Sequence, residues 1–285
     1  CFVAGYDFPG RSTDPYDVLS HGSHVASTIA DSTNNGIGGV GIAFGACIMP
    51  VKVLSDEGWG TTEDIAEGIR FAADHGANVI NMSLGGGGYS KELDDALNYA
   101  AKNNVVSVCA AGNAGRSTIE YPAALPGCLA VSSVGPDKKL APYSSYGKAP
   151  DGKKGLFIAA PGGNKRDFGE EGGVWQSTVK DGNPEEWHMA SYQGTSMATP
   201  HVAGVAALVV SVLGSDYDRQ QVIDILAQSA DDQGDEEKFG NGILNAGTAV
   251  SIAADGGPGF HHKVVLAVIL FVLIAIVVAG RRLFK

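Results

Sequence analysis

The sequence predicts an α/β fold in which a parallel sheet lies between helices, followed by one C-terminal transmembrane helix. Short β-rich runs alternate with helical stretches, these runs are almost entirely apolar, and one uninterrupted apolar stretch stands near the C-terminus. Alternating strands and helices are typical of parallel sheets with crossover helices, and apolar strands are expected where helices cover both faces of a sheet. With 285 residues, 44% of them hydrophobic, the chain is long enough for one well-packed domain.

Six segments carry the alternation of strands and helices. They are expected in turn over residues 47–54, 61–76, 78–83, 90–103, 105–110 and 129–134. Thr61 followed three residues later by Asp64 predicts a helix start, and Gly76 predicts a helix end.

The second half of the chain contains one long polar segment and two further helices. Residues 162–191 are rich in Gly and charged residues and show no sustained period, so we expect a long surface loop at the rim of a site. Residues 196–213 are apolar nearly all round, which is typical of a buried helix, and residues 218–229 are amphipathic.

The apolar stretch near the C-terminus covers residues 264–280. As a helix its 17 residues would span roughly 25 Å, within the range of a membrane span, and a buried core helix is the alternative. Basic residues beside a span tend to stay cytoplasmic, so the domain is expected outside the cytoplasm, at the cell surface or in the periplasm. A C-terminal sorting signal that is cleaved during export is the alternative, and it would give a secreted protein. The chain then divides into a globular domain (1–250), a Gly-rich linker (251–263), a helix in membrane lipid (264–280) and a basic cytoplasmic tail (281–285).

The charge of the chain limits the classes of molecule that it can bind, and its cysteines limit the bonds that it can form. The net charge is −11, and residues 263–285 hold four Lys or Arg and no acid, so the rest of the chain carries −15 (−11 − 4). Such an acidic body argues against nucleic acid as a partner.

Four cysteines can pair in three ways in an oxidising setting, and their spacing selects no pairing. Metal binding by these four is disfavoured, because they form no C-x-x-C pattern: Cys1, Cys47, Cys109 and Cys128.

Three segments place reactive polar side chains beside small residues in apolar surroundings. Ser196 starts the predicted buried helix, with Pro200 in its first turn, and the positive field of a helix start favours an oxyanion there. A serine nucleophile also needs a base, for which His21 is the candidate. The segments are Ser20-His21-Gly22-Ser23-His24-Val25-Ala26, Ala110-Ala111-Gly112-Asn113-Ala114-Gly115 and Gly194-Thr195-Ser196-Met197-Ala198-Thr199-Pro200-His201-Val202-Ala203-Gly204.

In order and spacing, these segments resemble the signatures of the subtilisin-like serine peptidases over roughly residues 1–250. The resemblance implies a subtilisin-like three-layer fold and a serine endopeptidase acting on polypeptides. It makes Ser196 the nucleophile and His21 the general base and acid. Asn113 and the Ser196 backbone N–H become the oxyanion donors, and catalysis needs no cofactor.

The resemblance also places a substrate groove. Ser83-Leu84-Gly85 and Gly58-Trp59-Gly60 resemble the two edges between which an extended peptide adds as a strand. Glu120, just before Tyr121-Pro122, falls at the base of a specificity pocket walled by residues 83–85 and by Ala111-Gly112. A carboxylate there would favour an Arg or Lys side chain before the scissile bond, whereas a Glu120 turned outward to solvent is the alternative.

A calcium-binding loop is a further implication of the resemblance. The expected ligands are the Asn35 side chain and the carbonyl groups of Thr33, Ile37 and Gly39, a mixed oxygen set that calcium accepts. A glycine-rich loop without metal is the alternative.

The catalytic aspartate of the resembled family, within an Asp-Ser/Thr-Gly motif, is not found. Asp7, Asp14 and Asp17 precede His21, but none is followed by Ser/Thr-Gly. We therefore expect that the sequence is a truncated piece with weak activity. A non-catalytic, membrane-anchored binding module is the alternative. The α/β-hydrolases are disfavoured, because their Gly-x-Ser-x-Gly pattern fails at Ala198.

Overall fold

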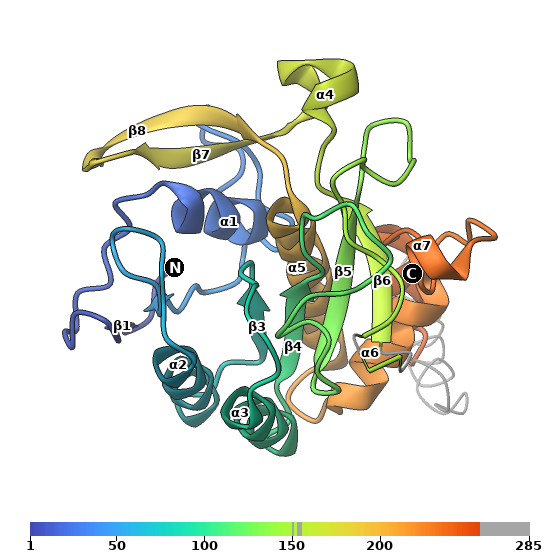
Figure 1. Cartoon of the computed structure of the whole chain (residues 1–285), viewed down its shortest axis with the longest axis horizontal. Coiled ribbons are helices and arrows are strands. Elements are labelled where there is room, and N and C mark those ends of the chain that lie inside the picture. The colour runs from blue at the N-terminus through green and yellow to red at the C-terminus, as the bar shows by residue number, and fades with distance from the viewer. Residues whose placement is uncertain (150, 153–155, 257–285) are drawn as a thin grey trace, which may run out of the picture.

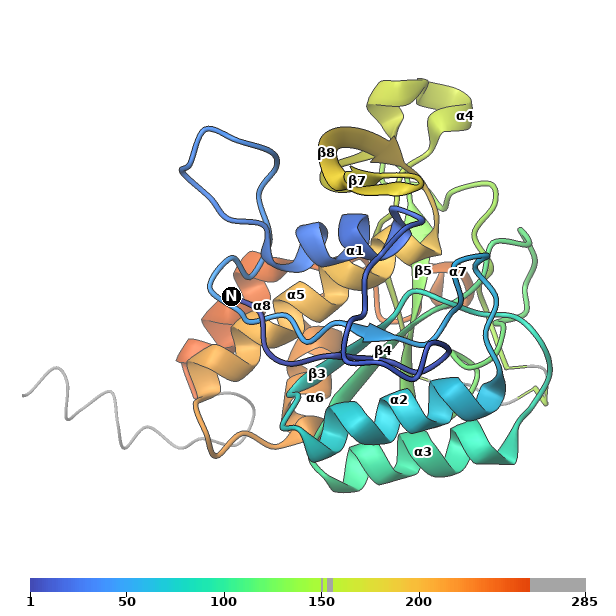
Figure 2. The same cartoon turned by 90° about the vertical axis from the view of Figure 1, so that its left-hand side faces the viewer.

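A parallel sheet with helices on both faces forms the centre of the molecule. The computed structural model describes residues 1–149, 151–152 and 156–256 (Figure 1). Helices α5 and α6 pack on one face of the sheet, and α2 and α3 lie on the other, which confirms the predicted α/β class (Figure 2). The four sheet strands are all parallel and stand in chain order: β3 (Val79–Met82), β4 (Val106–Ala110), β5 (Cys128–Val134) and β6 (Leu156–Pro161).

The predicted alternation matches the observed elements, with β2, β3 and β4 shorter than predicted and β5 one residue longer. The six segments correspond to β2 (Val51–Lys52), α2 (Thr62–Asp74), β3, α3 (Lys91–Lys102), β4 and β5. The Thr61 side chain accepts a hydrogen bond from the Asp64 N–H, which confirms the predicted start of α2. Strand β6 was not predicted, although its Leu-Phe-Ile-Ala-Ala-Pro sequence is an apolar run of strand length.

A separate two-stranded parallel sheet, β1 (Tyr6–Asp7) with β2, lies on the β3 side of the main sheet (Figure 1). Among the described residues no strand pairing joins β2 to β3. Strand β4, with neighbours on both edges, is buried throughout, whereas three of the four β3 residues are only half-buried. The β3 strand therefore has one open edge, which faces β2.

Helix α5 (Thr195–Leu213) runs through the core and begins one residue before the predicted start. In the described part of the chain it is the one helix long and apolar enough to cross a membrane, but it packs against the sheet, α1 (His21–Ala30) and α8. The prediction that Pro200 lies in the first turn was wrong, since it is the sixth residue of α5. Without a Pro200 N–H, the carbonyl of Ser196 four residues earlier loses its intrahelical donor. The Ser83 hydroxyl replaces that donor at 2.7 Å.

The globular domain ends later than predicted. Residues 251–254, assigned to a linker, belong to α8 (Ala246–Ala254), because Ala249 and Ala253 lie four residues apart on one buried face against α5. The predicted transmembrane helix and basic tail lie outside the described residues. The other C-terminal helices are α6 (Arg219–Ser229), capped by Asp218, and α7 (Glu236–Phe239).

The polar segment 162–191 forms a β-hairpin rather than the predicted loop. It contains α4 (Lys165–Phe168), a 3-10 turn η1 (Glu170–Gly172), and the antiparallel strands β7 (Val174–Lys180) and β8 (Asn183–Tyr192), which lie over α1 (Figure 2). The prediction failed because part of the buried side of β7 is polar. Gln176 donates to the Val40 carbonyl and Thr178 to the Ser20 carbonyl. Because these buried residues are polar, the sequence of β7 does not show the alternation of apolar and polar residues that predicts a strand.

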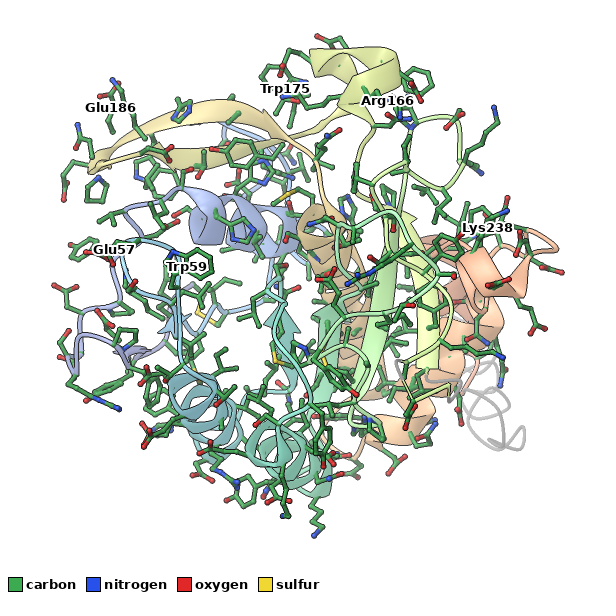
Figure 3. All side chains as sticks on the ribbon, in the orientation of Figure 1. Glu57, Trp59, Arg166, Trp175, Glu186 and Lys238 are labelled. Carbon is green, nitrogen blue, oxygen red and sulfur yellow. A yellow bond between two sulfur atoms is a disulfide. The ribbon has the colours of Figure 1, made fainter. Side chains whose placement is uncertain are left out.

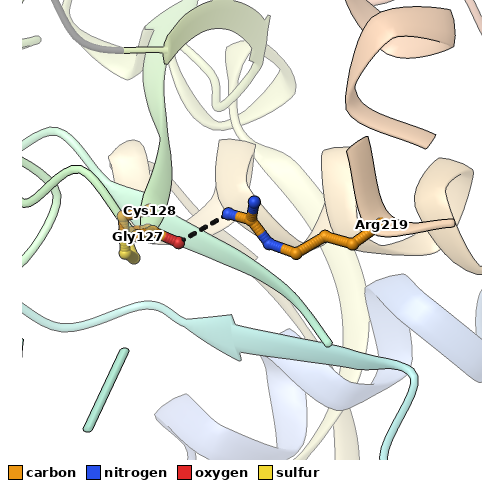
Figure 4. Close-up of a disulfide and its surroundings, with 4 residues drawn as sticks. Gly127, Cys128 and Arg219 are labelled. Atoms are coloured by element: carbon orange, nitrogen blue, oxygen red, sulfur yellow. Dashed lines mark hydrogen bonds between the residues drawn. A yellow bond between two sulfur atoms is a disulfide. The ribbon is translucent and has the colours of Figure 1, made fainter. Parts of the chain in front are cut away.

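Two disulfides resolve the pairing that the sequence left open. Cys1 pairs with Cys47, and Cys109 on β4 pairs with Cys128 at the start of β5. Close to the second disulfide, the Arg219 guanidinium donates to the carbonyl oxygens of Val105 at 3.1 Å and Gly127 at 3.0 Å (Figure 4). These contacts attach the first residue of α6 to the starts of β4 and β5.

Candidate active site

His21 is held at the first position of α1 by the turn before it. Ser20 adopts a left-handed conformation (φ 62°), and its side chain does not cap the helix. Asp17 does so instead, accepting from the Ser23 N–H at 2.7 Å and from the Leu19 N–H at 3.0 Å. The cap fixes the direction in which the His21 side chain leaves the helix.

The hairpin ties the start of α1 to the segment that carries Ser196. The Ser20 hydroxyl shares a 2.7 Å hydrogen bond with the Tyr192 hydroxyl, and the Gly182 N–H donates to the Val18 carbonyl at 2.8 Å. Because β8 ends at Tyr192, four residues before Ser196, the same strand positions both ends of the site. Residues 162–191 therefore border the site, as predicted, although with a different structure.

Ser196 and Ser83 hold each other by two hydrogen bonds. The Ser196 hydroxyl donates to the Ser83 carbonyl oxygen at 3.2 Å, and the Ser83 hydroxyl donates to the Ser196 carbonyl oxygen at 2.7 Å. In the part of the chain that the structure describes, no hydrogen bond joins Ser196 to His21. The nucleophile candidate thus lies directly beside the predicted substrate-binding segment 83–85.

Two N–H donors converge beside Ser196. The Asn113 Oδ1 accepts from the Thr195 N–H at 2.9 Å and from the Thr195 hydroxyl at 3.1 Å, which leaves Nδ2 without a partner among the described residues. A methyl group built on Gly194 would lie 3.6 Å from the Ser196 nitrogen and 3.8 Å from the Asn113 Nδ2. Gly194 has no side chain and a φ of 152°, so the region between the two donors stays open.

Replacing Asn113 by Asp is expected to lower kcat by about 10²–10³-fold, the loss known for one oxyanion donor of a subtilisin. The carboxylate keeps an acceptor for Thr195 but lacks the Nδ2 donor. Asn113→Leu removes both, so it should lower kcat similarly and also lower the melting temperature. Steady-state kinetics and thermal unfolding of the two variants check this, and an unchanged kcat in Asn113→Asp would exclude Asn113 as an oxyanion donor.

His21 is suited to act as a neutral base. Burial lowers the pKa of His21 from its ordinary value, and the nearby charge of Asp17 opposes this shift. Across the described residues no carboxylate forms a hydrogen bond with His21: the Asp7 carboxylate accepts from the Gly10 N–H, and Asp17 caps α1. The group that would orient the imidazole is thus not found among the described residues.

His24 and His201 have structural roles. His24 is fully buried and stacked on Tyr192 at 4.5 Å, with its Nε2 at 3.1 and 3.2 Å from the carbonyl oxygens of Val174 and Ala190. His201 Nδ1 lies 2.8 Å from the Met197 carbonyl oxygen. These contacts hold both imidazole rings against backbone carbonyl groups of the interior.

Lowering the pH below about 6.5 is expected to destabilise the fold through His24. Burial lowers the pKa of His24 in the folded state. Its contribution to stability is therefore complete above the unfolded pKa and is lost as the pH falls towards the folded pKa. Thermal unfolding between pH 7.5 and 5 measures this. His24→Gln should flatten the decline, whereas His75→Gln, at an exposed position, should not; equal slopes in all three proteins would contradict the prediction.

The two predicted groove edges lie at the two ends of the candidate site, one near His21 and the other against Ser196. Gly58, Trp59 and Gly60 are exposed on the loop after β2, and Trp59 has 80% of its surface exposed (Figure 3). A methyl group built on Gly58 would lie 3.5 Å from the Leu19 side chain, two residues before His21. The segment Ser83, Leu84 and Gly85 contacts Ser196 on one side and Tyr121 on the other.

Glu120 is turned inward, not outward to solvent as in the alternative. Only 22% of its side chain is exposed. A methyl group built on Gly112 would overlap the Glu120 side chain, at 2.7 Å from Oε1, and one built on Gly85 would lie 3.8 Å from Oε2. The carboxylate thus lies between the two segments that were predicted to wall the pocket.

The predicted calcium loop is tied to Asp31. The Asp31 carboxylate accepts from the Gly39 N–H and the Ser177 hydroxyl, and the Asn35 Oδ1 accepts from the Ile37 N–H. Thr33, Asn35, Ile37 and Gly39 would supply four oxygens, fewer than the six to eight that calcium takes. No group of three or more His, Cys, Asp or Glu suited to a metal occurs in the described ranges. These residues alone do not fit a complete calcium site.

Two converging N–H donors beside a hydroxyl stabilise negative charge on an oxygen next to that hydroxyl, which is the requirement of acyl transfer. With a histidine whose pKa burial lowers at the neighbouring helix start, the site brings together the groups that acyl transfer on a serine hydroxyl requires. The model of the subtilase family matches residues 2–242, and the chain belongs to that family.

Known relatives are serine proteases. The chain is 39% identical over 249 residues to a thermophilic serine proteinase of Bacillus sp. strain AK1, covering 87% of this chain and 56% of the relative. It is 38% identical to subtilisin BL of Lederbergia lenta, covering 86% and 82%. A protease structure from Pseudoalteromonas arctica PAMC 21717 superposes with a TM-score of 0.79 at 34% identity, covering 88% and 84%. The chain thus spans little more than half the length of some of the relatives that it matches.

Proposed function

We propose that this protein is a serine endopeptidase that cleaves polypeptides through an acyl-enzyme on Ser196. The observation that carries the proposal is the convergence of the unpaired Asn113 Nδ2 and the Ser196 N–H beside the Ser196 hydroxyl. The subtilase family and the protease relatives support the same chemistry.

The reaction is acyl transfer in two steps. The Ser196 oxygen attacks the carbonyl carbon of the scissile bond while His21 takes the hydroxyl proton. Asn113 and the Ser196 N–H stabilise the oxyanion, and His21 then protonates the leaving amine as the C–N bond breaks. Water, deprotonated by His21, hydrolyses the acyl-enzyme and regenerates the Ser196 hydroxyl.

The proposal includes one more parallel strand, between β2 and β3, that carries the catalytic aspartate. The open edge of β3, its half-buried residues and the lack of pairing between β2 and β3 support it. A second sign is the buried Asn81 Oδ1 on β3, which has no hydrogen-bond partner among the described residues. In a parallel sheet the carboxyl end of this strand would lie at the same edge as Ser83.

A serine-reactive fluorophosphonate tests the function directly. We expect covalent labelling of Ser196, located by mass spectrometry of the digested protein, and no labelling of Ser196→Ala. Ser83→Ala is the control for a nearby serine, and it should still be labelled at Ser196. If folded protein is not labelled at all, the alternative of a non-catalytic binding module is favoured.

Membrane anchoring through residues 264–280, with residues 281–285 in the cytoplasm, is part of the proposal and rests on the sequence alone. Protease added to intact cells should remove the catalytic domain and leave a C-terminal tag protected. A tag that is digested from outside would reverse the orientation, and a tag that is lost would favour the secreted alternative.

Structural calcium at residues 33–39 is a separate proposal. The one amide and three carbonyl groups support it only in part. A melting temperature that rises with added calcium and falls with a chelator would support it. A melting temperature that changes in neither condition would support the alternative, a glycine-rich loop without metal.

A further inference from the structure

The Glu120 carboxylate is a charge placed where a substrate side chain would enter. Its two oxygens face the two glycines on either side, Oε1 towards Gly112 and Oε2 towards Gly85. Gly112 is followed by the oxyanion donor Asn113, and Gly85 lies two residues after Ser83, which contacts Ser196. A side chain next to a carbonyl held at Ser196 would therefore lie close to this carboxylate.

Arg116 is the cation that faces this carboxylate. Its Nη2 lies 3.7 Å from the Glu120 Oε1, which is an ion pair but too long for a hydrogen bond. The Arg116 side chain is 62% exposed, whereas that of Glu120 is 22% exposed. Within the described ranges the guanidinium has no other ion pair or hydrogen bond, so the contact is loose and reversible.

We propose that Glu120 selects Arg or Lys immediately before the scissile bond, and that Arg116 is the counter-ion that this substrate cation replaces. A half-buried carboxylate between glycine backbones needs a cation, and a guanidinium held between the two walls can form shorter, charge-assisted hydrogen bonds than Arg116 does. Displacing Arg116 costs little, because exposed ion pairs are weak. This proposal rests on the serine endopeptidase function proposed above.

Three variants separate the roles of the two residues. Paired peptide substrates differ only in Arg or Leu before the scissile bond, and kcat/KM is measured for each. Glu120→Gln is expected to lower the Arg-to-Leu ratio by about 10²-fold, the effect of removing one partner of a half-buried charge pair. Arg116→Gln should raise that ratio by about 1.5–5-fold, since the competing pair is exposed. Arg166→Gln, on α4 (Figure 3), is the matched control and should leave the ratio unchanged, because Arg166 is also exposed and pairs with Asp167 rather than with Glu120.

Benzamidine, a small arginine-like cation, gives a readout that needs no substrate turnover. It should slow the fluorophosphonate labelling of Ser196 in the unchanged protein, more strongly in Arg116→Gln, and hardly at all in Glu120→Gln. Labelling that proceeds at the same rate with and without benzamidine, or an Arg-to-Leu ratio unchanged by Glu120→Gln, would overturn the selectivity. A ratio unaffected by Arg116→Gln would overturn the counter-ion role. Failure of the proposed function is distinct, because then Ser196 would not be labelled under any condition.

Discussion

The 285-residue chain is expected to turn over peptides with a kcat about 3 × 10⁴ below that of a subtilisin with a complete triad, the loss known for removing the aspartate alone. In the described residues no carboxylate binds His21, and the Ser196 hydroxyl donates to Ser83 instead of His21. Nothing therefore holds the imidazole in the tautomer that accepts the serine proton. The measurement is kcat on a tetrapeptide anilide, with active sites counted by fluorophosphonate titration.

A near-normal kcat would contradict this expectation and would point to Asp7, Asp14 or Asp17 as a substitute. Asp17 is the carboxylate whose charge acts on His21. Asp17→Asn separates its two roles, because the amide oxygen still accepts from the Ser23 N–H of the helix and only the bond from the Leu19 N–H is lost. A large loss of kcat without a loss of thermal stability would then identify Asp17 as catalytic.

Ser196→Ala is expected to bring kcat to about 2 × 10⁶ below that of a complete triad, which is about 70-fold below the unchanged 285-residue chain. The further loss is small because a serine without an oriented base is already a poor nucleophile. For the same reason, His21→Ala combined with Ser196→Ala should cost no more than Ser196→Ala alone. Single-turnover kinetics of His21→Ala, of Ser196→Ala and of the double variant check this. Additive losses would show that His21 and Ser196 do not act as a unit.

The elements that sequence reasoning identified are those whose pattern follows from burial alone. Residues 105–110 are almost entirely apolar because helices cover both faces of β4, which is buried throughout. The hairpin was missed because its contacts with the rest of the molecule are polar, through Gln176 and Thr178. A polar segment that is buried by hydrogen bonding looks like a surface loop in sequence.

The local motifs of the candidate site lie together in the structure, and the roles of their residues stay predictions. Structure brings Asn113, Ser196 and Ser83 together as expected, and it places Glu120 against Gly112. No sequence pattern pointed to Arg116, because a spacing of four residues implies contact in a helix but not in an irregular segment. The prediction for Pro200 failed because it depended on the exact first residue of the helix. Helix α5 starts at Thr195, so Pro200 lies beyond its first turn.

The paired hydrogen bonds between Ser83 and Ser196 engage the hydroxyl that we propose as the nucleophile. A peptide that adds as a strand along residues 83–85 needs backbone carbonyl acceptors there, and the Ser83 carbonyl is held by the Ser196 hydroxyl. A substrate N–H that takes this carbonyl sets the hydroxyl free at the moment when a scissile bond arrives. Strand pairing by the substrate and release of the Ser196 hydroxyl would then be one event.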